Sequence, residues 1–387
     1  MWNFVSPRIV FGEGALDVLG ELKGKRALVV TDSTLVELGL VERVKAHLDR
    51  AGIEMHIFDG VEPDPSVQMV CQGAEVALDV SPDWIIGLGG GSPMDAAKAV
   101  WVLYERPDIE PAAINPFDDL GLRQKAHLVT IPTTSGTGAE VTWAIVLTDT
   151  EEQRKMGLGN RENIADIAVV DPVMAAGMPP QLTADTGLDA LTHAVEGYTC
   201  AWHTDLSDGL CVKAARLVFE NLSLAVTNGA DMLARERMHN AATCAGLGFG
   251  NAMAAIAHSM GHVLGSVFHV PHGRAVGLCL SYTIEFAART APERFAQMAA
   301  VLGISRAAGE DGARALAARI RDLSREVGNP TCISEMGITR QAYEAQLEKL
   351  VDDAFNDTQV VAAARMPSFE EMERLFVCAY GGDPADF

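Results

Sequence analysis

The sequence has no run of 18 or more apolar residues, and its first residues do not form a basic segment followed by an apolar one. A membrane-spanning helix needs the first feature and an export signal needs the second, so we expect a cytoplasmic protein. None of its seven cysteines forms a C-x-x-C pair. We therefore expect reduced thiols in the core and no disulfide framework.

Basic residues are scarce relative to acidic ones. Lysine and arginine number 30 against 52 aspartates and glutamates, which gives a formal net charge of −22. Such a surface repels phosphate backbones and anionic lipids, so we expect neither nucleic-acid binding nor a membrane-surface role. The length of 387 residues exceeds what one hydrophobic core usually supports, and two domains are expected.

The two halves of the chain differ in their hydrophobic pattern. Up to about residue 180, short β-branched segments alternate with helical ones, which predicts an α/β domain with a largely parallel sheet. The expected strands lie in residues 8–11, 26–32, 55–60, 83–91, 127–134 and 167–172. The remainder has helical periodicity, for example in residues 208–222, 234–246 and 311–328. We predict an α/β domain over residues 1–180 and an all-helical domain over 181–387, since the Pro179-Pro180 step separates the two patterns.

A glycine-rich turn follows one of the expected strands, in DWIIGLGGGSPMDAAK, residues 83–98. Ser92 stands where a helix N-cap is expected, and Asp95 lies three residues after it. The amide groups of a helix start attract anions, and glycine lets the backbone approach a phosphate without Cβ clashes. The segment favours a diphosphate site, with a tight structural turn as the alternative. The consecutive glycines are Gly89, Gly90 and Gly91.

Two further segments place polar groups after expected strands. Asp32 closes the strand at 26–32, where its carboxylate could accept hydrogen bonds from ribose hydroxyls or cap the next helix. The hydroxyl-rich segment IPTTSGTGAE, residues 131–140, could bind a nucleotide or cap the following turn. The position after a strand's carboxyl end favours a ligand.

Aspartate and histidine recur at helical spacing in the second half. Asp189 and His193 are four residues apart, as are His258 and His262, so each pair lies on one helix face, and His272 follows. A carboxylate with several imidazoles suits iron(II), zinc, manganese or cobalt better than calcium or magnesium. Any one of these residues could instead pack or cap a helix. Together they favour a metal site, because burying several ionisable groups is costly unless something pairs with them.

These segments together resemble the iron-containing (group III) alcohol dehydrogenase family, over nearly the whole chain. The likeness rests on GGGSPMDAAKA, PTTSGTGAEVT, TGLDALTHAVEGY, the H-x3-H-x-L-G…PHG region and DDAFNDTQVVAAARMP. It is greatest for branches such as lactaldehyde reductase and 1,3-propanediol dehydrogenase. The resemblance implies a divalent metal, iron(II) first with zinc or manganese as alternatives, and NAD(H) as the cofactor.

The resemblance also implies roles for single residues. Asp189, His193, His258 and His272 match the family's metal ligands, whereas His262 matches a histidine that stays off the ion and is suited to carry a proton near neutral pH. The α/β domain would bind the dinucleotide and the helical domain the metal and substrate. The positions that match the family's cofactor contacts are Asp32, Gly89, Gly90, Gly91, Ser92, Asp95, Thr133, Thr134, Thr137 and Lys155.

The implied reaction is hydride transfer between NAD(H) and a small primary alcohol or aldehyde, with the alcohol oxygen bound to the ion as an alkoxide. An apolar fraction of 48% and the habit of the family suggest a homodimer or larger oligomer. Three alternatives remain. They are a secondary-alcohol enzyme resembling glycerol dehydrogenase, a non-redox enzyme resembling dehydroquinate synthase, and an NAD-binding protein without activity.

Overall fold

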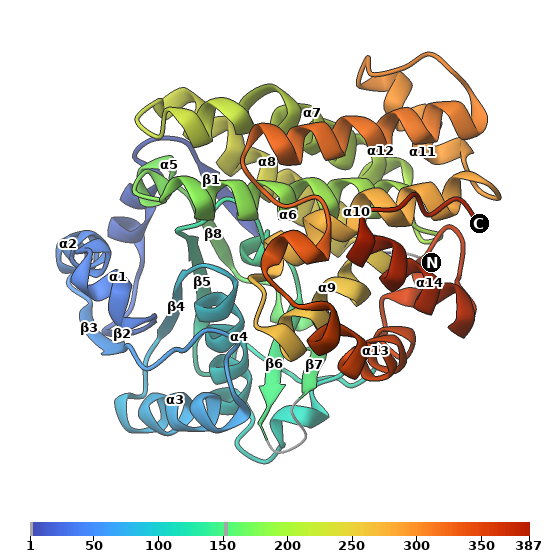
Figure 1. The fold of residues 1–387 in the computed structure, drawn as a ribbon. Coiled ribbons are helices and arrows are strands. Elements are labelled where there is room, and N and C mark those ends of the chain that lie inside the picture. The colour runs from blue at the N-terminus through green and yellow to red at the C-terminus, as the bar shows by residue number, and fades with distance from the viewer. Residues whose placement is uncertain (1–2, 151–153) are drawn as a thin grey trace. The chain divides into compact units, whose positions relative to one another are not determined.

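The computed structural model describes residues 3–150 and 154–387 and divides the chain into two compact units, Met1–Gly177 and Met178–Phe387. Figure 1 colours the first unit from blue to green and the second from green to red. The predicted architecture, an α/β domain with a parallel sheet followed by a helical domain, is confirmed. The sequence placed the boundary after residue 180, whereas the first unit ends at Gly177.

A six-stranded sheet organises the first unit, with the order β1-β8-β5-β4-β2-β3. All of its pairs are parallel; Trp84 of β4, for example, lies opposite His127 of β5. From β2 the chain adds β3 on one side, and it then crosses over to add β4 on the other side of β2. The carboxyl ends of β2 and β4 are therefore the switch point, where α/β sheets usually bind ligands. The strands are β1 (Arg8–Phe11), β2 (Arg26–Val30), β3 (Glu54–Phe58), β4 (Trp84–Gly89), β5 (His127–Pro132) and β8 (Ile167–Val170).

Alternating side chains of each strand enter two separate hydrophobic clusters. Leu28 and Val30 of β2 pack with residues of α3 and α4. Ala27 and Val29 pack with residues of η1 and α2 on the opposite face. Coverage of both faces explains why these strands read as continuous apolar runs. The helices of this unit are η1 (Ala15–Glu21), α1 (Ser33–Glu37), α2 (Leu40–Ala51), α3 (Val67–Val80), α4 (Gly91–Glu105), η2 (Pro111–Ala113), η3 (Ala139–Val141), η4 (Arg161–Asn163) and α5 (Pro172–Ala175).

A second sheet, which the sequence did not predict, is an antiparallel pair formed by β6 (Ala144–Asp149) and β7 (Arg154–Gly159). Ile145 and Leu147 of β6 are buried in the cluster that contains α4. The intervening residues, 150–153, carry threonine, glutamate and glutamine rather than the Asn-Gly or Asp-Gly of a short hairpin turn, so the usual signal is missing.

The second unit contains helices and, among the residues that the structure describes, no strand. The predicted helical stretches 208–222 and 234–246 fall within α7 and α8, and the stretch 311–328 lies in α12 except for its last two residues, because that helix ends at Glu326. The helices are α6 (Pro180–Thr199), α7 (Asp205–Thr227), α8 (Met232–Gly250), α9 (Ile256–Phe268), α10 (His272–Ala288), α11 (Glu293–Val301), α12 (Gly309–Glu326), η5 (Ile333–Met336), α13 (Arg340–Phe355), η6 (Val360–Ala362) and α14 (Phe369–Gly381).

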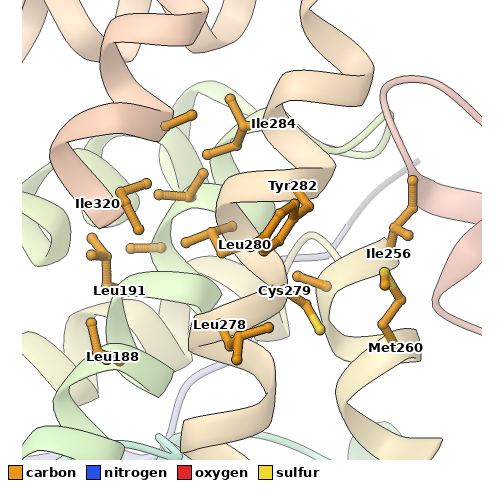
Figure 2. Packing of buried hydrophobic residues seen from close by; sticks show 14 of the residues in the cluster. Leu188, Leu191, Ile256, Met260, Leu278, Cys279, Leu280, Tyr282, Ile284 and Ile320 are labelled. Atoms are coloured by element: carbon orange, nitrogen blue, oxygen red, sulfur yellow. The ribbon is translucent and has the colours of Figure 1, made fainter. Parts of the chain in front are cut away.

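Helices α6, α9 and α10 pack around one apolar core. Figure 2 shows Leu278 and Leu280 of α10 between Leu191 of α6 and Met260 of α9. These side chains are almost fully buried. The core therefore fixes the three helices on which the predicted ligands lie.

Two expectations from composition concern cysteines and membranes. All seven cysteines are free thiols, of which Cys200, Cys211, Cys279 and Cys332 are buried while Cys71 is exposed. The core assignment thus holds for four of them and is wrong for Cys71. Among the described residues, none of the helices combines the length and apolar character needed to cross a membrane.

Candidate active site

The nucleotide-binding segments predicted from the sequence meet at the carboxyl ends of β2, β4 and β5. Thr31 Oγ1 donates a hydrogen bond to the carbonyl oxygen of Leu88 at 2.9 Å, which joins the ends of β2 and β4. The amide of Thr133 donates to the carbonyl oxygen of Gly89 at 2.9 Å, which joins the loops after β4 and β5. The three segments thus lie beside the switch point of the sheet.

The glycine loop has little room for side chains. A Cβ on Gly89, whose φ is +152°, would lie 2.4 Å from Cγ of Pro93. On Gly90 it would lie 3.4 Å from Thr134 Oγ1, and on Gly91 it would lie 3.1 Å from Thr137 Cγ2. The glycine loop and the threonine loop therefore form adjoining walls, and the absence of side chains on the three glycines lets a ligand approach the backbone.

The predicted N-cap at Ser92 is wrong. Helix α4 begins at Gly91 with Gly90 as its N-cap, and this glycine has no side chain that could accept a hydrogen bond from the first turn. The start lies earlier because the extended Gly90, at φ −78° and ψ −158°, turns the chain directly out of β4. Ser92 and Pro93 then fall inside the first turn. A helix start without its own cap offers its amide groups to an anion.

Asp95 does not complete a capping box either. Its Oδ2 accepts a hydrogen bond from the amide of Val146 at 3.0 Å, and its Oδ1 lies 3.3 Å from Nζ of Lys98. Burial raises the pKa of Asp95 and lowers the pKa of Lys98, and the attraction between them opposes both shifts. Lys98 Nζ also donates to the carbonyl oxygen of Ala144 at 2.8 Å. The pair ties the glycine-loop helix to β6, a link that the sequence did not indicate.

Three of the other predicted cofactor contacts have partners within the first unit. Asp32 Oδ1 accepts a hydrogen bond from the amide of Leu35 at 3.0 Å and so caps α1, the alternative considered from the sequence. Thr137 Oγ1 accepts from the amide of Ala139 at 3.3 Å. Lys155 of β7 donates to Asp64 Oδ1 at 2.7 Å. These contacts leave the proposed roles of Asp32, Thr137 and Lys155 as predictions.

In the second unit, three helices bring the predicted metal ligands together. Asp189 Oδ1 lies 3.6 Å from His193 Nδ1, 3.7 Å from His258 Nε2 and 3.6 Å from His272 Nε2. Asp189, His258 and His272 form a group in which one ligand atom from each lies within 4.8 Å of the others. Two ligands about 2.1 Å from an ion in tetrahedral geometry lie roughly 3.4 Å apart, so these separations suit a first-row divalent ion.

The polar atoms of this cluster fit an ion better than they fit each other. Asp189 Oδ1 and His258 Nε2 are buried and have no hydrogen-bond partner within 3.5 Å. Burial alone would raise the pKa of Asp189, but the charges of His193, His272 and His258 overcome this and hold the pKa well below its ordinary value. The cluster favours a positive charge beside Asp189, which a divalent cation would provide.

His193 lies at one side of this group. Its ring stacks on Phe249, with centroids 3.9 Å apart, and on His258, with centroids 4.4 Å apart. It approaches Asp189 through Nδ1 but is not part of the three-residue group. A fourth ligand at His193 therefore remains a prediction.

The turn between α9 and α10 places His272 opposite His258. Helix α9 ends at Phe268, and its C-cap residue, His269, adopts a left-handed conformation at φ +56° and is exposed. A Cβ on Gly273 would lie 2.3 Å from the carbonyl oxygen of Asp185, so the start of α10 packs directly on the backbone of α6. Arg274 fastens this contact with two hydrogen bonds to the Asp185 carboxylate, at 3.1 and 2.9 Å.

Two acidic residues that the sequence analysis missed contact the histidines of α9. Glu196 Oε2 lies 2.6 Å from His258 Nδ1, and Asp357 Oδ2 lies 2.8 Å from His262 Nδ1. A signal for Glu196 existed, since it lies seven residues after Asp189 on the same helix face. Asp357 carried no local signal, because it approaches α9 from 95 residues away.

Comparison with known proteins places this geometry in context. The family model described as iron-containing alcohol dehydrogenase matches residues 6–172, and its C-terminal model matches residues 183–380. The NADPH-dependent butanol dehydrogenase of Clostridium saccharobutylicum is 40% identical over 390 residues, covering 100% of both chains. The chain also matches bifunctional aldehyde-alcohol dehydrogenases, such as that of Escherichia coli, but spans only 46% of their length.

Solved structures give the same relationship. The structure of 1,3-propanediol oxidoreductase has a TM-score of 0.92 and 34% identity, covering 98% of this chain and 100% of that one. The sulfoacetaldehyde reductase of Bifidobacterium kashiwanohense, solved in complex with NAD+, has a TM-score of 0.87 and 27% identity, covering 99% of this chain and 100% of the other.

Proposed function

Because this chain belongs to the iron-containing alcohol dehydrogenase family, whose relatives are alcohol and aldehyde oxidoreductases, we propose that it transfers hydride between NAD(H) and a small primary alcohol or aldehyde with the help of a divalent metal. The observation that carries the proposal is the buried Asp189 carboxylate, which three imidazole nitrogens approach to within 3.6–3.7 Å. Iron(II) is the proposed ion, with zinc or manganese as alternatives.

Each unit supplies one part of this chemistry. We assign the diphosphate of NAD(H) to the uncapped start of α4 beside Gly90 and Gly91, with the threonine loop as the adjoining wall. We assign the metal to Asp189, His193, His258 and His272. When bound, the ion would polarise the substrate oxygen as a Lewis acid, and the nicotinamide would exchange hydride with the substrate carbon.

His262 is the proposed proton carrier. It shares a helix face with His258, and its ring stacks on His272 with centroids 5.5 Å apart. Its Nδ1 lies against Asp357, and the Asp357 carboxylate can only accept a hydrogen bond. Nδ1 therefore holds the ring proton, which leaves Nε2 to receive a proton from an alcohol or return it to an aldehyde.

NAD(H) rather than NADP(H) is proposed from Asp32, which follows β2 at the switch point of the sheet. A carboxylate there would accept hydrogen bonds from ribose and repel a 2′-phosphate. The butanol dehydrogenase relative is named as NADPH-dependent, so the proposal of NAD(H) rests on Asp32 of this chain and not on that relative. We also propose a cytoplasmic homodimer or larger homo-oligomer.

Anaerobic purification, metal analysis and turnover assays with short primary alcohols and aldehydes test the proposal. Asp189→Asn, His258→Ala and His272→Ala should each lose bound metal and nearly all turnover. NADH binding, measured by fluorescence titration, should persist because the glycine loop belongs to the other unit. Full metal occupancy in two or more of these variants would reject the ligand assignment.

The three-residue metal group supports one second candidate, a secondary-alcohol enzyme resembling glycerol dehydrogenase, for which three ligands suffice. His193→Ala decides between the two. Loss of metal favours the four-ligand primary-alcohol enzyme, whereas retained metal with preferential turnover of secondary alcohols favours the alternative. The non-redox alternative would need several basic residues to bind a phosphorylated acid, and Arg274, the basic residue that follows the α9 segment, is paired with Asp185.

A further inference from the structure

Glu196 is a buried carboxylate that the proposed reaction does not use directly. It is 4% exposed, and it accepts hydrogen bonds from the amides of Ala255 at 2.9 Å and Ala257 at 2.6 Å. Ala255 is the N-cap residue of α9, which has no side-chain cap of its own. Glu196 thus satisfies two of the free amides at the start of α9 from the neighbouring helix α6.

The same carboxylate contacts a predicted metal ligand. Glu196 Oε2 lies 2.6 Å from Nδ1 of His258, at the third position of α9. Both oxygens of Glu196 already accept amide hydrogens, so the carboxylate acts as an acceptor and Nδ1 carries the ring proton. The other nitrogen, Nε2, is therefore the one that can face an ion, and it lies 3.7 Å from Asp189 Oδ1.

We propose that Glu196 is a positioning residue that fixes the tautomer and the orientation of His258 so that Nε2 binds the metal ion. The inference rests on the proposed function. Carboxylates that hold a ligating histidine in this way typically change metal affinity by 10- to 100-fold when they are replaced. Asp357 holds His262 in the same tautomer, so the tautomer alone does not decide which histidine ligates; position relative to Asp189 does.

Replacement of Glu196 by glutamine tests this without changing side-chain size. If the amide nitrogen takes the place of Oε2, it donates to Nδ1 and forces the proton onto Nε2, which then cannot ligate. If it takes the place of Oε1, two N–H donors face each other at Ala257, and Nδ1–H then donates to an uncharged amide oxygen instead of a carboxylate. Either arrangement should weaken metal binding, by roughly 10- to 100-fold.

Glu285 provides a matched control in the same unit. It is a buried carboxylate of α10 that accepts hydrogen bonds from Arg321 at 2.8 Å and from the amide of Ala385 at 3.1 Å. It lies 13 residues beyond His272 along α10, which is roughly 20 Å of helix. Glu285→Gln and Glu196→Gln should both lower thermal stability, but Glu285→Gln should leave metal affinity unchanged.

The measurement is competition of the full-length, metal-free proteins with a chromogenic chelator for Zn²⁺, together with the visible absorption spectrum after Co²⁺ addition. We expect weaker binding and an altered Co²⁺ spectrum for Glu196→Gln, and partial recovery for Glu196→Asp, which keeps the charge. Affinity within about twofold of wild type in Glu196→Gln, alongside clear loss in His258→Ala, overturns this inference but not the proposed function. A wild-type protein that binds neither ion overturns both.

If Glu196→Gln does not fold, Glu196→Asp decides alone. Its shorter side chain cannot reach both Nδ1 and the two amides in the native arrangement, so a measurable loss of Zn²⁺ affinity supports the inference. Unchanged affinity in Glu196→Asp overturns it.

Discussion

Nδ1 of His262 lies 2.8 Å from Oδ2 of Asp357, a residue that reaches helix α9 from 95 positions further along the chain. Burial would raise the pKa of Asp357, but the hydrogen bond and charge of His262 hold it below its ordinary value. Asp357 Oδ1 also accepts a hydrogen bond from the amide of Gln359 at 2.8 Å. His262 is thereby held by a residue that is itself fixed.

This arrangement predicts that His262→Ala retains metal and cofactor but loses turnover by about 10²- to 10⁴-fold, the usual contribution of a positioned acid or base. Asp357→Asn should cause a smaller loss, because the histidine remains but its tautomer is no longer fixed. Metal analysis, NADH titration and steady-state kinetics measure these effects. His269→Asn is the control: it changes an exposed histidine at the end of the same helix to a residue that tolerates left-handed backbone, and it should leave turnover unchanged.

Cofactor preference should depend on the charge of Asp32. The unmodified enzyme should prefer NAD, and Asp32→Gly should narrow or reverse this preference by at least about tenfold, equivalent to about 1.4 kcal/mol. Asp32 also caps α1, so Asp32→Ser, which removes the charge but can still cap, separates the two effects. Similar shifts in the ratio of kcat/KM for NAD and NADP in both variants would identify charge as the cause. Equal use of both cofactors by the unmodified enzyme would contradict the assignment.

Local patterns predicted much of this molecule, and long-range contacts account for what they missed. Apolar residues and glycines predicted a strand at 83–91 and a helix after it. The predicted helix start was wrong, because the extended conformation of Gly90 lets the helix begin at Gly91. The pairing of Asp189 with His193 followed from helical spacing. The approach of His272 required the packing of α10 on α6, and the support from Asp357 required the packing of α13 on α9; no local pattern reports either contact.

Stability below neutral pH should depend on His239, a buried histidine of α8. Burial lowers the pKa of His239 from 6.5 to about 4. Between these two values the unfolded chain binds a proton at His239 that the folded protein does not bind. The free energy of unfolding therefore decreases progressively as pH falls from about 6.5 to about 4. The full shift corresponds to on the order of 3 kcal/mol. Melting temperatures between pH 7 and pH 4.5 should fall less steeply in His239→Gln than in wild type; parallel curves would contradict the prediction.

The close contact between α10 and α6 predicts opposite effects for two Gly→Ala replacements. In Gly273→Ala, the new Cβ would lie 2.3 Å from the backbone oxygen of Asp185, so α10 must move away from α6 and carry the adjacent His272 with it. We expect a loss of roughly 1–3 kcal/mol in stability, as in other overpacked sites, and weaker metal binding.

Gly209 of α7 is exposed, and a Cβ there would contact nothing within 4 Å. Gly209→Ala should therefore stabilise the protein by up to about 1 kcal/mol, because alanine favours the helix, and leave metal affinity unchanged. Thermal unfolding and chelator competition on both variants measure these effects. A Gly273→Ala protein that is as stable as wild type and binds the ion equally well would show that the α6–α10 contact does not position His272.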